Sequence, residues 1–277
     1  PGEELLCETT SHIARAELGA AAVFSGITTR TWPSKLGQLR AADPLAIAHP
    51  NAGPYLVSTT AIAVENTHNF GGGTVQSIEE IKKLRTTSKE MGISLHLDGA
   101  RIWNAHIASG IGLKDFGAHV DTLSVCLSKG LGAPVGSLMI STKERIARAR
   151  VWRKRYGGGM RQIGILAAAG HYALDNNVTR LTEDHIRAKK LALACHKALS
   201  STIDPTTVET NIVALDITGA TINAAEFAAQ AKQKGLLLSA LGPNFVRLVT
   251  HLDIDDESTE KAGKILVDLL KSAFVAK

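Results

Sequence analysis

Two polar residues at the ends of apolar runs are the positions in this sequence best placed to do chemistry. Asp98 ends the run ISLHLD, and Lys129 follows the run TLSVCL after one serine. The two positions are 31 residues apart, about one strand–helix–strand unit. If both runs are strands of a parallel sheet, both side chains lie beyond its carboxyl edge, where α/β proteins bind ligands.

A lysine and a carboxylate are the pair that an aldehyde cofactor requires. The amine condenses with the aldehyde to a Schiff base, and the carboxylate keeps a ring nitrogen protonated so that the ring can accept electrons. Small residues follow both positions and would let a bulky ligand approach the backbone. The spacing equally fits an Asp98 that caps the next helix and a Lys129 that is a solvated turn residue. The two residues alone leave both interpretations open.

Composition narrows the class of protein and of ligand. The chain has 277 residues, of which 44% are hydrophobic and 21% charged, as in ordinary globular proteins. A formal net charge of +5 is combined with only 4% aromatic residues. Few aromatics disfavour a nucleic-acid surface built on base stacking. The mild positive charge favours an anionic small-molecule ligand instead.

The cysteines and the absence of targeting patterns indicate a compartment. Cys7, Cys126 and Cys195 form no C-x-x-C pair and have no histidine at metal-ligand spacing. A sparse, odd number of cysteines suits a reducing compartment. No run reaches the length of a transmembrane helix, and the first residues lack the layout of a signal peptide. We therefore expect a cytoplasmic protein without a metal ion or a membrane partner.

The elements that must position Asp98 and Lys129 follow from apolar runs and helical periodicity. Ser77 and Glu80 have the spacing of a capping box at the start of a helix. Strands that alternate with helices predict an α/β fold with a mainly parallel sheet covered on both faces. The expected strands are residues 3–8, 56–65, 93–98, 122–127 and 135–140, and the expected helices are 11–25 and 77–91.

The second part of the chain changes character and predicts a separate, smaller α+β domain. We place the boundary between residues 182 and 183, which gives a large domain, 1–182, and a small C-terminal domain, 183–277. The triple glycines 71–73 and 157–159 fit neither a P-loop nor a dinucleotide fingerprint and are interpreted as flexible loops. Helices are expected at 163–200 with a break at 175–177, at 224–234 and at 259–274, and strands at 207–217, 236–239 and 245–250.

Several longer blocks resemble one family. HLDGARIWNA (96–105) and SVCLSKGLGAPVGSLM (124–139) are similar to the low-specificity L-threonine aldolases, β-eliminating lyases of the type I pyridoxal-phosphate group. The resemblance implies a type I aminotransferase-like fold and retro-aldol cleavage of L-threonine or L-allo-threonine to glycine and acetaldehyde. Further similar blocks, in the family's order, are VENTHN (64–69), WRKRYGGGMRQIGILAAAG (152–170), VRLVTHLD (246–253) and, more loosely, SHIARAELGAAAVFSG (11–26).

The resemblance implies roles at matching positions. Lys129 would bind pyridoxal phosphate as a Schiff base, and Asp98 would pair with the ring nitrogen. Arg101 would border the cofactor and, with Arg247, hold the substrate carboxylate, a task suited to planar guanidinium groups. His12 would stack on the cofactor ring.

Three further residues have roles implied by the family. His68 would lie near the substrate hydroxyl and take its proton, unless an ordered water does so. Lys154 and Arg161 resemble basic residues that reach the cofactor phosphate from a neighbouring subunit. Family members are usually tetramers, so we expect a homo-oligomer. Simpler interpretations exist: Arg101 could merely pair with Asp98, and the other residues could be ordinary core or surface side chains.

The resemblance is incomplete at the N-terminal end. Family members carry an Arg-Ser-Asp-Thr motif near the substrate and a Gly-Thr loop at the cofactor phosphate, and neither occurs in this sequence. We expect weaker cofactor binding without these backbone donors. Two alternatives therefore stay open. One is another type I pyridoxal-phosphate lyase or transaminase, and the other is an inactive remnant that serves as a binding or assembly subunit.

Overall fold

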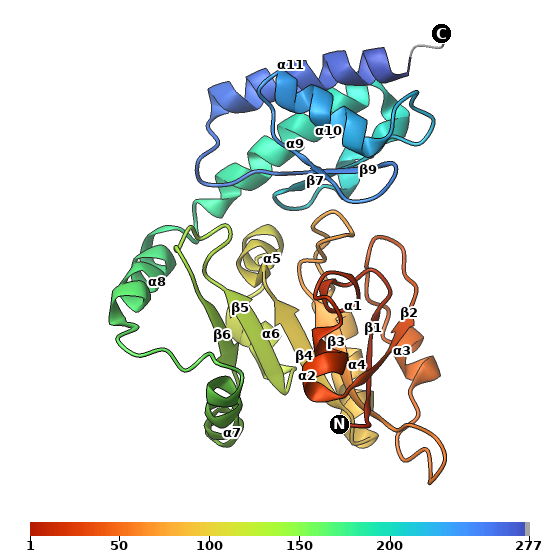
Figure 1. The fold of residues 1–277 in the computed structure, drawn as a ribbon, viewed down its shortest axis with the longest axis vertical. Helices are drawn as coiled ribbons and strands as arrows, with labels where there is room; N and C mark the ends of the chain where they lie inside the picture. Colours follow the sequence, from red (N-terminus) through yellow and green to blue (C-terminus); the bar gives the residue numbers. More distant parts are fainter. Residues whose placement is uncertain (275–277) are drawn as a thin grey trace. The chain divides into compact units, whose positions relative to one another are not determined.

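A six-stranded sheet forms the centre of the first part of the chain (Figure 1). All neighbouring strands are parallel except the last pair, which is antiparallel. The carboxyl ends of the five parallel strands therefore lie along one edge of the sheet, as predicted for a mainly parallel sheet. In spatial order the strands are β2 (Thr28–Trp32), β1 (Glu4–Glu8), β3 (Thr59–Glu65), β4 (Ser94–Gly99), β5 (Thr122–Cys126) and β6 (Ser137–Ile140).

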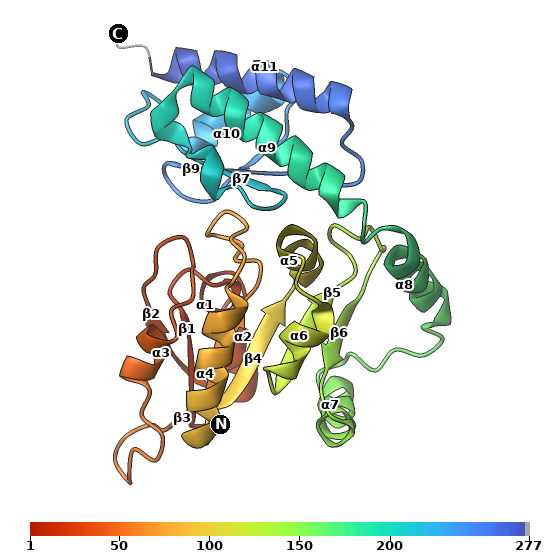
Figure 2. The same ribbon diagram turned by 180° about the vertical axis from the view of Figure 1, so that it is seen from behind.

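Helices cover this sheet on both faces. Strand side chains alternate between the faces, so Leu6 and Leu97 enter one apolar cluster and Leu5 enters another. The larger cluster is closed by α3 (Ala42–Ile47), α4 (Ile78–Glu90), α5 (Ile102–Ser109) and α6 (Leu113–Ala118), of which α4 and α6 stand in front in Figure 2. The short helices α1 (His12–Arg15) and α2 (Ala20–Ser25) lie on the opposite face.

Two expectations for this part of the chain are wrong. The helix predicted over residues 11–25 is broken into α1 and α2, because Leu18 and Gly19 both take positive φ angles, of 54° and 71°. The capping box at α4 does not form, since the Ser77 side chain makes no capping hydrogen bond. Glu80 instead accepts a hydrogen bond from the Ala41 amide at 2.8 Å. The partner of the Glu80 carboxylate is therefore the distant Ala41 amide and not the amide of the neighbouring Ser77.

Two helices complete this region beyond β6. They are α7 (Lys143–Arg155), which has no buried residue, and α8 (Gly164–Asn176). The end of β6 pairs with the start of β5, through Ile140 and Leu123, and α7 begins three residues later. The helix therefore starts at the amino edge of the sheet, opposite the carboxyl ends of the parallel strands.

The C-terminal part has its own sheet and core. Three antiparallel strands, in the order β7-β9-β8, are β7 (Ile212–Asp216), β9 (Phe245–Val249) and β8 (Ser239–Ala240). Their apolar face packs on α9 (Leu181–Ala198), α10 (Ala224–Gln233) and α11 (Asp256–Ala273). The strand predicted over 236–239 is wrong except at its last residue, because only Ser239 and Ala240 pair with β9. The strand predicted over 207–217 is shorter than expected, because β7 begins only at Ile212. The remaining elements expected here form within a few residues of their predicted bounds.

The structure describes residues 1–274, and the chain separates into two units. Unit 1 contains residues 1–70 and 75–178, and unit 2 contains residues 71–74 and those from 179 onward. The domain division between residues 182 and 183 remains a prediction about folding units. No helix within residues 1–274 is both long and apolar enough to cross a membrane.

Candidate active site

Four of the predicted site residues follow neighbouring strands at the carboxyl edge of the unit 1 sheet. His12 follows β1, His68 follows β3, Asp98 is the second-last residue of β4, and Lys129 follows β5. In register, Asp98 lies opposite Glu65 on one side and Ser124 on the other. Adjacent strands are about 4.8 Å apart. The topology therefore brings together the ends of the chain segments that carry these four residues.

Asp98 ends β4 with its carboxylate fixed by the backbone. The Ala100 amide donates to Asp98 Oδ1 at 3.0 Å, and the side chain is only partly exposed. The next residue must be glycine, because a Cβ at Gly99 would lie 2.7 Å from Leu123 and 2.8 Å from the Ser124 carbonyl oxygen. The sequence suggested that this small residue makes room for a ligand. In the structure it makes room for the neighbouring strand.

Lys129 projects from a tight turn that follows β5. The Gly132 amide donates to the Lys129 carbonyl at 2.9 Å, and the Ala133 amide donates to the Leu127 carbonyl at 3.0 Å. Gly132 has a φ of 72°, which suits glycine at this position. Leu131 is buried and anchors the turn, whereas the Lys129 side chain is exposed. A rigid turn therefore presents an accessible primary amine.

Glu65, which sequence reasoning missed, ties two of the strand ends together. Its two carboxylate oxygens accept hydrogen bonds from the His12 amide at 2.6 Å and the Asn69 amide at 2.7 Å. The His12 ring is 39% exposed, and its Nδ1 lies 3.0 Å from a Glu17 carboxylate oxygen. Glu65 ends a predicted strand, but its partner could not be predicted, because His12 is 53 residues away.

His68 is buried in a polar pocket rather than open to a ligand. Its side chain is 1% exposed, and its Nε2 donates to Glu8 Oε2 at 3.1 Å. A Cβ on Gly37 would lie 2.1 Å from the ring, so the backbone at Gly37 covers one face of the imidazole. Burial by itself would raise the pKa of Glu8, but hydrogen bonds from His68 and Thr10 lower it to about 2. Glu8 is therefore a charged partner for His68.

Arg101 stands at the start of α5, three residues after Asp98. Its Nη1 donates to Asn69 Oδ1 at 3.2 Å, which connects the segment after β4 to the segment after β3. Because the Asn69 backbone is held by Glu65, Arg101 is positioned through a chain of two hydrogen bonds.

Three of the predicted residues belong to segments other than the ends of these parallel strands. Lys154, near the end of α7, and Arg161 are both exposed, and α7 begins at the opposite edge of the sheet. Arg247 belongs to unit 2, where it lies on β9 opposite Ala214 of β7 and Ser239 of β8. It is half-buried, and burial lowers the pKa of its guanidinium group from the ordinary value.

The donor set at the carboxyl edge fits an aldehyde cofactor with a basic ring nitrogen. One strand end offers an exposed amine, and its neighbour offers a carboxylate held by a backbone amide. Within residues 1–274, no group of three or more histidines, cysteines or acidic residues is placed to hold a metal ion.

Known proteins match this chain in sequence and in fold. The beta-eliminating lyase family matches residues 1–218. A low specificity L-threonine aldolase of Escherichia coli K12 is 39% identical over 256 residues, which are 92% of this chain and 74% of that protein. Low-specificity L-threonine aldolase 1 of Arabidopsis thaliana is 35% identical over 91% of this chain and 72% of its own length.

Solved structures share the fold. A threonine aldolase of Leishmania major has a TM-score of 0.76 and 21% identity, over 98% of this chain and 78% of that one. A Thermus thermophilus aspartate aminotransferase variant has a TM-score of 0.71 and 16% identity, over 97% and 70%. The fold is thus the predicted type I aminotransferase-like fold. With the sequence relatives, these findings establish that the chain belongs to the beta-eliminating lyase family, in the group of the low-specificity L-threonine aldolases.

Proposed function

We propose that this chain is a pyridoxal-phosphate-dependent carbon–carbon lyase that cleaves L-threonine and L-allo-threonine to glycine and acetaldehyde. The observation that carries the proposal is the pairing of an exposed Lys129 and a fixed Asp98 on neighbouring strand ends, in a chain whose relatives are low-specificity L-threonine aldolases. The reaction belongs to amino-acid metabolism, as threonine breakdown and glycine formation.

Lys129 and Asp98 have complementary tasks in this proposal. Pyridoxal phosphate, when bound, supplies an aldehyde that captures the substrate amine and a ring that takes up the electron pair of the broken Cα–Cβ bond. Lys129 Nζ would hold the cofactor through this aldehyde. The Asp98 carboxylate favours the protonated form of the ring nitrogen by charge. His12, partly exposed after β1 and tied to the end of β3 through Glu65, is proposed to stack on the ring.

Two arginines are proposed to hold the substrate carboxylate. Arg101 is fixed by Asn69, which leaves a planar guanidinium group in a defined orientation. Arg247 is proposed from the family resemblance, and its partial burial supports this role because a half-buried guanidinium is poorly hydrated and favours an anionic partner.

The group that takes the hydroxyl proton is proposed to be an ordered water or His68. The burial of His68 favours the water, because a ring that is 1% exposed and covered by Gly37 has little open surface for a substrate hydroxyl. His68 and Glu8 would then position the segment that borders the hydroxyl.

We also propose a homo-oligomer, a tetramer by resemblance. The stretch that carries Lys154 and Arg161 exposes Trp152, Met160 and Ile165, the last of them by 83%. An apolar surface of this kind is typical of subunit contacts. It supports the proposal that the two basic side chains reach the cofactor phosphate of a neighbouring subunit.

The three thiols support a reducing, cytoplasmic location. Cys7, Cys126 and Cys195 are all free, and Cys7 and Cys195 are buried. Burial raises the pKa of the Cys195 thiol to about 12, so this thiol stays protonated and unreactive at neutral pH.

A product assay tests the proposed function. The purified chain is saturated with pyridoxal phosphate and given L-threonine, and acetaldehyde is measured by its reduction with NADH and alcohol dehydrogenase. We expect acetaldehyde and glycine in equal amounts, and none from Lys129→Ala. Pyruvate from L-serine, or transfer of an amino group to a keto acid, would indicate another type I reaction. A chain that never retains the cofactor would be a binding or assembly subunit.

A further inference from the structure

A cavity of about 490 Å³ lies at the segment that connects β2 to α3. Its described lining residues all fall between positions 32 and 47, within unit 1. Trp32 ends the edge strand β2, which is separated from β4 by β1 and β3. Because neighbouring strands are about 4.8 Å apart, Trp32 and Asp98 belong to strands that lie roughly 14 Å apart. Neither Asp98 nor Lys129 lines the cavity, so it is separate from the proposed active site.

Two polar atoms in the wall of this cavity are buried and have no hydrogen-bond partner within residues 1–274. They are the indole Nε1 of Trp32 and the hydroxyl oxygen of Ser34. Trp32 is 3% exposed, and its ring packs into the larger apolar cluster of unit 1. Its carbonyl accepts a hydrogen bond from the Thr9 amide at 2.9 Å, which fixes the backbone as well. An indole nitrogen only donates, so this fixed N–H requires an acceptor.

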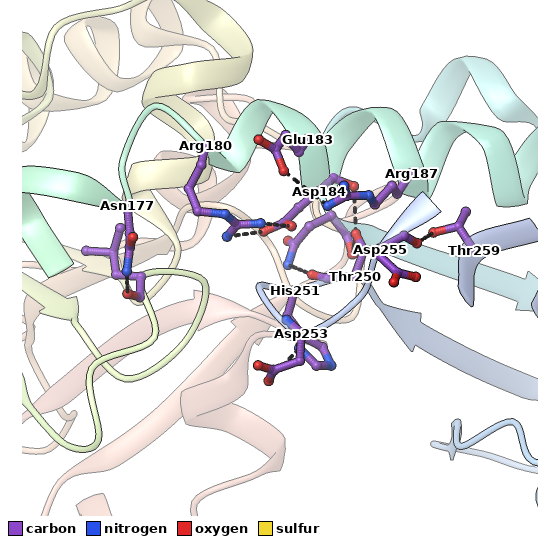
Figure 3. Close-up of polar contacts among 12 residues, drawn as sticks. Asn177, Arg180, Glu183, Asp184, Arg187, Thr250, His251, Asp253, Asp255 and Thr259 are labelled. Carbon is purple, nitrogen blue, oxygen red and sulfur yellow. Dashed lines mark hydrogen bonds and ion pairs between the residues drawn. The ribbon is translucent and has the colours of Figure 1, made fainter. Parts of the chain in front are cut away.

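Other buried polar groups of the chain have their partners within the protein. In unit 2 the fully buried Asp184 carboxylate pairs with Arg180, and the Thr250 hydroxyl donates to the Asp184 carbonyl at 2.6 Å (Figure 3). In unit 1 the indole of Trp103 donates from Nε1 to the Cys126 carbonyl at 2.8 Å. The two donors in the cavity wall differ from these groups, which favours an acceptor that a ligand supplies.

The rim of the cavity is positively charged. Lys35 and Arg40 belong to the lining, and both are exposed. Neither forms an ion pair within the described part of the chain, although Arg40 is within electrostatic reach of Glu80, whose carboxylate pairs with Lys83. Asp43 is the one carboxylate among the described lining residues, so two positive charges and one negative charge leave a net charge of +1. Such a lining favours a singly charged anion.

Apolar surface completes the lining. Pro33, Ala46 and Ile47 contribute it together with the Trp32 ring. A volume of about 490 Å³ lies within the range typical of small-molecule sites, about 300–1,000 Å³. An inorganic ion alone would leave most of this space to water, because one water molecule takes only about 30 Å³ of liquid volume. The lining therefore fits an anionic group that carries a short apolar chain.

We propose that this cavity binds a small organic monoanion. Lys35 and Arg40 hold its carboxylate or phosphate group, and Ile47 contacts its apolar part. The same anionic group accepts hydrogen bonds from Trp32 Nε1 and the Ser34 hydroxyl. These two donors are shielded from solvent, so the anion reaches them as exposed side chains at the rim reorient, which takes picoseconds to nanoseconds. The proposal goes beyond the proposed function, because no step of threonine cleavage involves this cavity.

NMR of the three indole N–H groups tests the proposal. The ¹⁵N-labelled chain is loaded with one equivalent of pyridoxal phosphate, so that the cofactor occupies the proposed active site. It is then titrated at about pH 6 and constant ionic strength with sodium acetate, hexanoate or phosphate. Trp32→Phe and Trp152→Phe assign the three resonances. We expect the Trp32 indole proton to move downfield and to saturate, whereas that of Trp103 stays in place because the Cys126 carbonyl is already its acceptor.

The three anions distinguish the sources of the charge. Saturation by acetate and hexanoate would assign a carboxylate ligand, with hexanoate half-saturating at the lower concentration because it also covers the apolar wall. Saturation by phosphate alone would assign a phosphate ester. An unchanged Trp32 resonance, or equal and unsaturable shifts of all three indoles, overturns the proposal, since the Trp32 N–H would then have another acceptor such as bound water.

Substitutions at the rim test the role of charge in the same titration. Lys35→Gln and Arg40→Gln should each raise the half-saturating concentration roughly three- to tenfold. Asp43→Asn should lower it about twofold or more, because it removes a negative charge from the lining. Lys114→Gln is the matched control, since Lys114 is an exposed lysine of α6 that does not line the cavity, and it should change nothing. Unchanged half-saturation in both Lys35→Gln and Arg40→Gln overturns the proposal.

Discussion

Replacing Glu8 with glutamine removes a buried charge on which the stability of unit 1 depends. Burial would raise the pKa of Glu8, but the hydrogen bonds from His68 and Thr10 outweigh it and lower this pKa from 4.5 to about 2. Because the folded pKa lies below the unfolded one, the carboxylate stabilises the fold fully above the unfolded value. This stabilisation is lost as the pH falls toward 2. A lowering of this size corresponds to about 3 kcal/mol of unfolding free energy.

Urea unfolding at several pH values measures this contribution. At pH 7 we expect Glu8→Gln to unfold with about 3 kcal/mol less free energy than the wild type. The difference should shrink as the pH is lowered, with less than half remaining at pH 3. Glu79→Gln is the control, since Glu79 is an exposed carboxylate paired with Lys82 on α4, and its effect should stay small throughout. A Glu8→Gln deficit that is the same at pH 7 and pH 3 would refute the reasoning.

Three further predictions concern single side chains. Gly37→Ala should lower the free energy of unfolding by at least about 1 kcal/mol, and by more than the control Gly92→Ala. Both glycines have φ near 70°, but only Gly37 faces the His68 ring. Equal losses of unfolding free energy in urea would contradict this packing. Burial lowers the pKa of His185 to about 4, so its ring should titrate near pH 4 by NMR. The free energy of unfolding should therefore decrease as the pH falls from 6.5 to 4. A titration midpoint of the ring near pH 6.5 would contradict this prediction. Asp98→Asn should slow threonine cleavage on the order of 10²-fold, measured as acetaldehyde release, while the absorbance of bound cofactor persists; an unchanged rate would remove Asp98 from the proposed site.

The helices and strands that were predicted are those whose apolar residues recur with the spacing of a helix or a strand. In β4, Leu95 and Leu97 alternate with polar residues, and α11 repeats its buried leucines at helical spacing. Strand β2 was missed because its sequence, TTRTW, buries only Trp32. Helix α7 was missed because it buries no residue, so its sequence has no apolar stripe to detect. Prediction from local sequence fails where a helix or strand has no apolar face of its own and depends on contacts with neighbouring elements.

The candidate site was predictable only in part for the same reason. The positions of Asp98 and Lys129 follow from local sequence, since each comes at or just after the end of an apolar run. Glu65 and Glu8 also end predicted strands, but their partners do not follow from local sequence, because Glu65 meets His12 across 53 residues and Glu8 meets His68 across 60. Such pairs depend on the register of the folded chain.

Reductive trapping tests the central claim most directly. The chain is saturated with pyridoxal phosphate, treated with borohydride, digested and analysed by mass spectrometry. We predict one stable adduct on the peptide that contains Lys129, and its disappearance in Lys129→Ala. An adduct confined to other lysines, or none at Lys129 in material that binds the cofactor, would contradict the account.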